Sequence, residues 1–385
     1  MNFYICKRLI SHTIKNYSHF QKEEAYFRSF VVFYSSSIKK PTKSNRVVFD
    51  LLRKHKFSPE IASKVASELS YLKDVEKCDS MLSFLKGSGF SVAHLERILN
   101  SKPRLLNSSI DNTVKPKIKI FQDMGLSSSD IADILSADPW VLYRSAVKGV
   151  EPSVMVLREL SGSSSELAKL LKVSGTFLKC NLERTMLPNI ELLKSCGIST
   201  ERIVKLLYSF PRFCLHKPEN MKKFVEKADS LGCNRNSRMY LHSLRTLASM
   251  SEKSWELKLE VFRNLGFSEE EILVMFQKKP QIFAISNRKI KKAVQILLET
   301  GKYDISYVFN HAEVLICSVE KRLGPRLRVL DILESRSLLK KRPRLSTIYK
   351  YTNEIFFKKY VSPYLDEVSE LTSEGAWTKE IHNLT

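Results

Sequence analysis

The chain has 385 residues, of which 43% are apolar and 27% are charged, and this composition is typical of a folded protein and excludes a disordered tail. Only 12 Gly and 13 Pro are present, which disfavours an all-β protein with many tight turns. The chain carries 63 Lys and Arg against 41 Asp and Glu, a net charge of +22, so phosphate backbones or other anionic surfaces are the expected partners.

Residues 1–37 are basic, rich in hydroxyl groups and poor in acids, which is the composition of an organelle transit peptide. Lys7, Arg8 and Lys15 lie among apolar residues, as in a basic amphipathic helix, so we expect targeting to the mitochondrion, with the chloroplast as the alternative. Residues 38–55 are predicted to form a linker and a first helix.

A turn of the form Gly-apolar-Ser then recurs every 33 to 36 residues. Glycine can adopt the left-handed conformation that ends a helix, and the serine that follows can cap the next helix. Ser268 and Glu271 also fit the capping-box pattern. Clear copies begin at Gly89, Gly125, Gly197 and Gly266, and degenerate copies at Lys56, Ser161, Gly232 and Gly301.

A second marker stands fourteen residues after the start of each turn. It is Pro103, Pro139, Pro211 or Pro280, with Gly175 and Thr246 where proline is missing. Proline cannot continue a helix interior, so we expect the helix to end there. The apolar residues two positions later are predicted to pack a short turn on the core, namely Leu105, Val141, Phe177, Phe213 and Ile282. Further prolines are predicted in the first turn of the following helix, namely Pro116, Pro152 and Pro188.

Each unit is therefore a helix, a proline-stopped turn and a second helix, and units of this kind must stack to bury their apolar faces. The sequence predicts an all-α solenoid of seven to eight helical repeats of about 35 residues over residues 56–325. Capping helices are expected over 326–362 and an acidic flexible tail over 363–385.

These repeats resemble those of a plant member of the mitochondrial transcription termination factor (mTERF) family. The resemblance covers most of 46–360 and rests on the copies beginning at Pro103 and Pro139, the glycine turns, and the stretches 318–326 and 356–361. It implies a curved solenoid with a basic groove along double-stranded nucleic acid, and a role in organelle transcription or RNA processing. Pentatricopeptide and tetratricopeptide units share the period, but both need two uninterrupted helices, which the marker proline contradicts.

Some cations keep phase with the repeat, nine residues after the marker, whose place in the last unit, about three residues shorter than the others, is taken by Ala312. Cations at helix N-termini oppose the helix dipole, and a bound phosphate would relieve that conflict. Asn112 and Asn220 occupy this phase in other units. The phased cations are Lys148, Arg184, Lys289 and Lys321, and the neighbours that we add to the predicted nucleic-acid site are Arg288, Lys292, Arg322 and Arg326.

Aromatic residues near the markers could stack on unpaired bases, but we interpret Trp140, Tyr143 and Phe213 as core residues. Catalytic and metal-binding motifs are missing, so we expect no enzyme, no cofactor and no metal. The nearest approach to a metal pair, His216 beside Cys214, is interpreted as packing. No apolar run approaches the roughly 20 residues that span a bilayer, so no membrane insertion is expected.

The sequence therefore predicts a monomeric organelle protein that binds double-stranded nucleic acid, DNA or RNA, and regulates transcription, transcription termination or transcript processing. Transcription or splicing proteins of the organelle are possible partners. A helical-repeat scaffold that holds another polypeptide in an organelle expression complex is the alternative.

Overall fold

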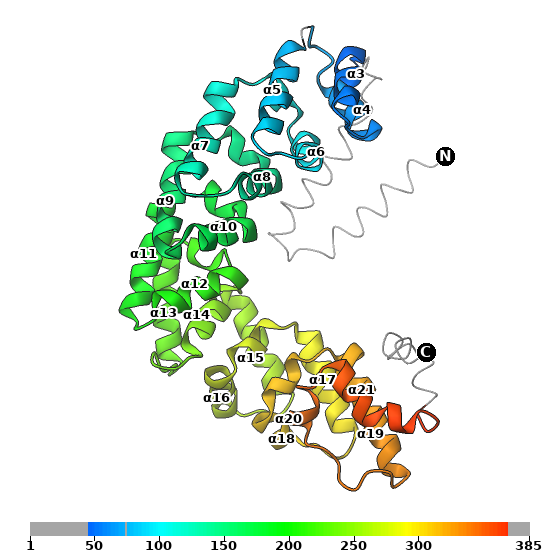
Figure 1. Cartoon of the computed structure of the whole chain (residues 1–385). Helices are drawn as coiled ribbons and strands as arrows, with labels where there is room; N and C mark the ends of the chain where they lie inside the picture. The colour runs from blue at the N-terminus through cyan, green and yellow to red at the C-terminus, as the bar shows by residue number, and fades with distance from the viewer. Residues whose placement is uncertain (1–44, 74, 369–385) are drawn as a thin grey trace, which may run out of the picture. The chain divides into compact units, whose positions relative to one another are not determined.

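The structure, a computed structural model, describes residues 45–73 and 75–368, and these residues form only helices and the turns between them (Figure 1). The predicted all-α helical-repeat fold is confirmed. The chain divides into two compact units, of which the first ends at Arg144 and the second begins at Ser145. The predicted transit peptide and most of the predicted tail lie outside the described residues.

In the first unit, the helices that follow the predicted turns stack from one repeat to the next, because α4 packs on α6 and α6 packs on α8. The elements of this unit are α3 (Arg46–Lys54), α4 (Pro59–Glu68), α5 (Glu76–Gly87), α6 (Val92–Ser101), η1 (Pro103–Asn107), η2 (Ile110–Val114), α7 (Lys115–Asp123), α8 (Ser128–Ala137) and η3 (Pro139–Tyr143).

In the second unit, α10 packs on α12 and α14 on α16, while the second helices of the repeats pack as α9 on α11, α11 on α13 and α15 on α17. Its elements are η4 (Ala146–Val150), α9 (Glu151–Ser161), α10 (Ser164–Val173), η5 (Gly175–Lys179), α11 (Leu182–Ser195), α12 (Thr200–Ser209), η6 (Phe213–Leu215), α13 (Pro218–Ser230), α14 (Tyr240–Ala248), α15 (Glu252–Asn264), α16 (Glu269–Lys278), η7 (Pro280–Ala284), α17 (Asn287–Glu299), α18 (Ile305–Asn310), η8 (Ala312–Ile316), η9 (Val319–Leu323), α19 (Gly324–Ser335), α20 (Leu345–Ile348), α21 (Asn353–Tyr360) and η10 (Ser362–Tyr364).

The glycine turns end helices as predicted. Gly89 has a φ of 95°, and a Cβ atom there would lie 2.8 Å from the Cβ of Ser128, so both conformation and space require glycine. Lys56 takes the same left-handed conformation in the degenerate first copy, with a φ of 70°. The predicted capping box of α16 is present, since Ser268 accepts from the Glu271 N–H and the Glu271 carboxylate accepts from the Ser268 N–H.

The marker prolines also act as predicted. Pro103, Pro139 and Pro280 each open a buried 3₁₀ turn, namely η1, η3 and η7. The five apolar residues predicted to follow a marker, namely Leu105, Val141, Phe177, Phe213 and Ile282, are all buried, so these short turns pack on the core as expected.

The prediction for the later prolines was right in two repeats and wrong in one. Pro116 and Pro152 lie in the first turn of α7 and α9. Pro188 instead lies inside α11, because the residues that form a π-helical turn in η2 and η4 are α-helical there, so α11 begins six residues before the proline. Pro188 has no N–H to donate to the carbonyl of Arg184.

One polar position links successive repeats through the carbonyl groups of the short turns. The Ser153 Oγ donates to the Cys180 carbonyl at 3.0 Å, and the Asn189 Nδ2 donates to the Cys214 and His216 carbonyls at 3.0 and 2.7 Å. Both residues are buried and lie eight residues after the cap of their helix. Carbonyls at the end of a short turn have no helical partner, so these side chains supply the missing donors.

Candidate nucleic-acid interface

The phased cations occupy equivalent positions in the structure. Lys148, Arg184, Lys289 and Lys321 each lie three residues after a capping Ser or Asn, and each donates its backbone N–H to that cap at 3.1 to 3.3 Å. The caps stand six residues after the marker and begin the second helical segment of the repeat. The predicted placement at helix N-termini is therefore correct, and the capping residues, which were not predicted, are Ser145, Asn181, Ser286 and Ser318.

Three of these four side chains are available to an external anion. Lys148, Arg184 and Lys321 are exposed. Within residues 45–73 and 75–368, none of the three side chains has a hydrogen-bond or ion-pair partner. We call Lys148, Arg184 and Lys321 the open row. Cations placed against the positive end of a helix gain free energy when an anion binds beside them.

Lys289 differs from the open row, because its Nζ donates to the Ile316 carbonyl at 2.5 Å. Its neighbour Lys292 forms an exposed ion pair with Glu320 at 3.0 Å. The hydrogen bond from Lys292 lowers the pKa of Glu320, and the charge of nearby Arg288 lowers it further. Arg288, Lys289 and Lys292 thus lie beside acceptors of their own chain, with which a phosphate must compete.

The structure contradicts the assignment of Arg326 to the nucleic-acid site. Its side chain is 1% exposed, and its guanidinium donates to the carbonyls of Ile348 and Tyr351 at 2.6 and 3.0 Å and to the Asn353 Oδ1 at 2.9 Å. Burial lowers the pKa of Arg326 to about 10. Arg322 is half-buried and donates to the Tyr349 and Tyr351 carbonyls. Both arginines fix the segment around α20 to the preceding repeat.

The interpretation of the aromatic residues as core was right for Phe213, which is 4% exposed, and wrong for the other two. Trp140 is 58% exposed and Tyr143 is 45% exposed. The Lys102 Nζ lies 2.9 Å from the centre of the Trp140 ring, which is a cation–π contact on one ring face. The first unit therefore presents an indole ring beside a cation, a combination that can stack an unpaired base.

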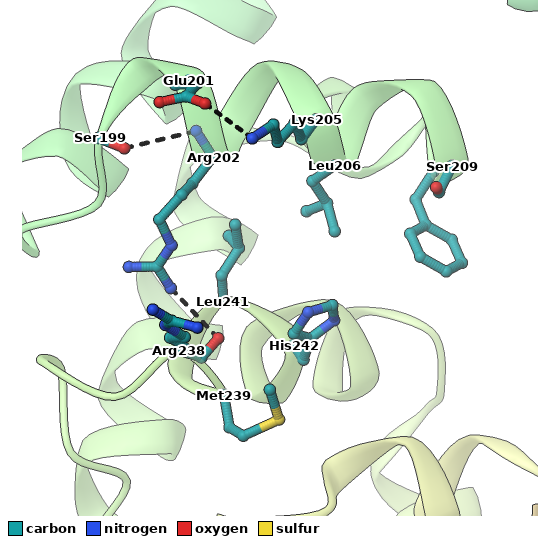
Figure 2. A pocket seen from close by; sticks show the side chains of 11 residues that line it. Ser199, Glu201, Arg202, Lys205, Leu206, Ser209, Arg238, Met239, Leu241 and His242 are labelled. Carbon is teal, nitrogen blue, oxygen red and sulfur yellow. Dashed lines mark hydrogen bonds and ion pairs between the residues drawn. The ribbon is translucent and has the colours of Figure 1, made fainter. Parts of the chain in front are cut away.

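A groove between α12 and α14 was not predicted from the sequence (Figure 2). It has a volume of about 540 Å³. Arg202 and Lys205 contribute from α12, Arg238 lies just before α14, and Leu206 and Leu241 line the space between the helices. The groove occurs where the repeat pattern fails, since the cap position of α14 is Met239, which has no capping side chain.

The described residues show few features of a metal or catalytic site. In 45–73 and 75–368 no group of three His, Cys, Asp or Glu side chains could hold a metal ion. Burial raises the pKa of Cys214 to about 12, and the His216 ring packs edge-on against Phe224 at 5.4 Å, as expected for packing residues. Over the same residues, no helix is both long enough and apolar enough to cross a membrane.

Comparison with known proteins agrees with this architecture. The family model described as mTERF matches residues 82–237 and 145–357, which together span well over half of the chain. No curated protein matches the chain. The matched residues include every marker proline, the open row and the α12–α14 groove. The chain therefore belongs to the mTERF family.

Proposed function

We propose that this protein binds double-stranded nucleic acid, DNA or RNA, in the mitochondrion, and that it regulates transcription, transcription termination or transcript processing there. Membership of the mTERF family indicates a nucleic-acid-binding helical-repeat protein rather than an enzyme. A net charge of +22 supports an anionic partner, because a field of this sign accelerates association with phosphate backbones.

The observation that carries the proposal is the open row. Lys148, Arg184 and Lys321 hold one position of the repeat, and their exposed side chains have no partner in the described part of the chain. Lysine and arginine at such positions contact phosphate without reading the base sequence. The open row thus accounts for affinity, whereas the choice of sequence requires contacts to base edges.

A filter-binding titration with a duplex DNA and a structured RNA, repeated at several salt concentrations, tests this function. We expect measurable affinity for at least one of them and a linear fall of log K with log salt, because phosphate contacts release counterions. The absence of affinity for both, or an affinity that does not change with salt, would contradict the proposal.

The compartment is proposed from residues 1–37, which lie outside the described residues. A fusion of residues 1–45 to a fluorescent protein tests it. We expect the reporter to accumulate in mitochondria, because the segment has the composition of a basic amphipathic presequence. Exclusive accumulation in plastids would contradict the mitochondrial proposal and favour the chloroplast as the compartment.

A further inference from the structure

The α12–α14 groove combines an apolar floor with a cationic rim. Leu206 and Leu241 form the floor and are almost fully buried, with Met239 and Phe210 beside them. Figure 2 shows Leu206 pointing from α12 towards α14, with the Arg202 side chain reaching across the groove near one end. Because Leu206 and Leu241 are already buried, an apolar side chain from a partner would gain affinity by covering the partly exposed Phe210 and Met239 beside them.

The rim has an excess of positive charge. Arg202 uses its Nη2 to donate to the Ser237 and Arg238 carbonyls at 3.4 and 3.2 Å, and no carboxylate pairs with its guanidinium in the groove lining. Arg238 is exposed, and its guanidinium has no partner among the described residues. The single lining carboxylate, Glu201, is paired with Lys205 at 2.7 Å. Two guanidinium groups therefore face the groove without a neutralising acid.

The lining does not suit a nucleobase. A base binds by stacking on an open ring face, but Phe210 is only partly exposed, and one of its faces is covered by the Arg245 guanidinium, whose central carbon lies 3.8 Å from the ring centre. The pKa of His242 is lowered by burial and by the charges of Arg245 and Arg202. An aliphatic floor instead fits a leucine or methionine side chain, in contrast to the exposed Trp140 ring of the first unit.

We propose that the α12–α14 groove docks an acidic peptide segment of a partner protein, which inserts one apolar side chain between Leu206 and Leu241 and places carboxylates against Arg202 and Arg238. Charge complementarity identifies the partner, because carboxylates flanking an apolar anchor match both the rim and the floor. This inference goes beyond nucleic-acid binding and does not depend on the open row.

The test uses the full chain and a phage-displayed library of random peptides, followed by fluorescence anisotropy with a labelled synthetic copy of an enriched sequence. Two variants alter the groove without removing its floor. Lys205→Glu with Arg238→Glu reverses two exposed rim charges, and Ser209→Trp places a bulky ring at the exposed edge. Lys77→Glu with Lys223→Glu is the matched control, since both residues are exposed and neither lines the groove.

We expect enriched peptides to carry an apolar residue flanked by Asp or Glu. Affinity should fall by about tenfold or more in both groove variants and should change little in the control. Circular dichroism of each variant shows whether the fold is retained. Failure to enrich such peptides, or equal binding to groove and control variants, would overturn the inference.

Duplex DNA added to the same proteins separates the two proposals. If the rim reversal weakens duplex binding more than the control reversal does, the groove belongs to the nucleic-acid surface and the docking inference is wrong. If both reversals weaken duplex binding equally and only the rim reversal weakens peptide binding, the groove is a separate docking site.

Discussion

Lys148 and Lys289 hold the same position in two repeats, and both donate a backbone N–H to a capping serine. Lys148 then extends into solvent, whereas Lys289 reaches the Ile316 carbonyl in the following repeat. Arg322 and Arg326 resemble Lys289 in this respect, since both donate to backbone carbonyls around α20. Phase within a repeat therefore determines where a cation is placed, but the acceptors of the following turn determine what it binds.

Among these cations, Arg326 is predicted to contribute most to the free energy of unfolding. Replacing Arg326 by Met removes a buried group that donates to the Ile348 and Tyr351 carbonyls and to Asn353. The two carbonyls lose these donors in a buried setting, so we expect a loss of about 2–4 kcal/mol in the free energy of unfolding.

Urea denaturation of the Arg326→Met variant measures this loss. Arg328→Met, a change at an exposed neighbour on the same helix, is the control and should cost much less. If the Arg326→Met protein were as stable as wild type but bound duplex more weakly, Arg326 would belong to the nucleic-acid interface after all.

Lys289 should give a smaller effect of the same kind. Lys289→Met removes the hydrogen bond to the Ile316 carbonyl, and because the side chain is only half-buried we expect a loss of about 1 kcal/mol. Lys148→Met should leave the free energy of unfolding unchanged within about 0.5 kcal/mol, because its side chain is exposed and lacks a partner in the described residues. Thermal unfolding measures both variants. If Lys289→Met and Lys148→Met lost the same free energy of unfolding, the two lysines would not differ in what they bind.

The smallest effect concerns pH. Lys258 is buried and donates to the Ile285 carbonyl, and burial lowers its pKa to about 8. Between pH 8 and the usual lysine pKa the unfolded chain binds more protons than the folded chain, so this residue makes stability rise with pH. The difference in unfolding free energy between wild type and Lys258→Met should therefore move in favour of wild type from pH 7.5 to pH 10. A constant difference would show that Lys258 does not titrate in this way.

The repeat could be predicted because its signals are local. Glycine, serine and proline act on the backbone within one turn, so Gly89, Ser268 and Pro103 reveal their roles without any tertiary information. The predicted position of Pro188, in the first turn of its helix, was wrong because the choice between a π-helical and an α-helical first turn depends on packing.

The site was less predictable because exposure depends on the neighbouring repeat. Trp140 shares its phase with the exposed Arg104 and Arg212, and this comparison could have placed it at the surface. Arg326 lies eight residues after its cap, as do Ser153 and Asn189, and all three are buried. The polar residues at this position in other repeats could therefore have indicated that Arg326 makes a buried contact. The groove has no such signal, because it arises from the irregular residues before α14.

The most direct test of the account compares two triple variants in duplex binding across a range of salt concentrations. One replaces the open row, Lys148, Arg184 and Lys321, by Gln, and the other replaces three exposed cations outside that phase, Lys77, Lys223 and Arg336, by Gln. Both remove the same charge. We predict that only the open-row variant flattens the slope of log K against log salt, by roughly 0.7–0.9 for each lost phosphate contact. Equal changes in the two variants would mean that net charge alone governs binding and would contradict the assignment of the open row.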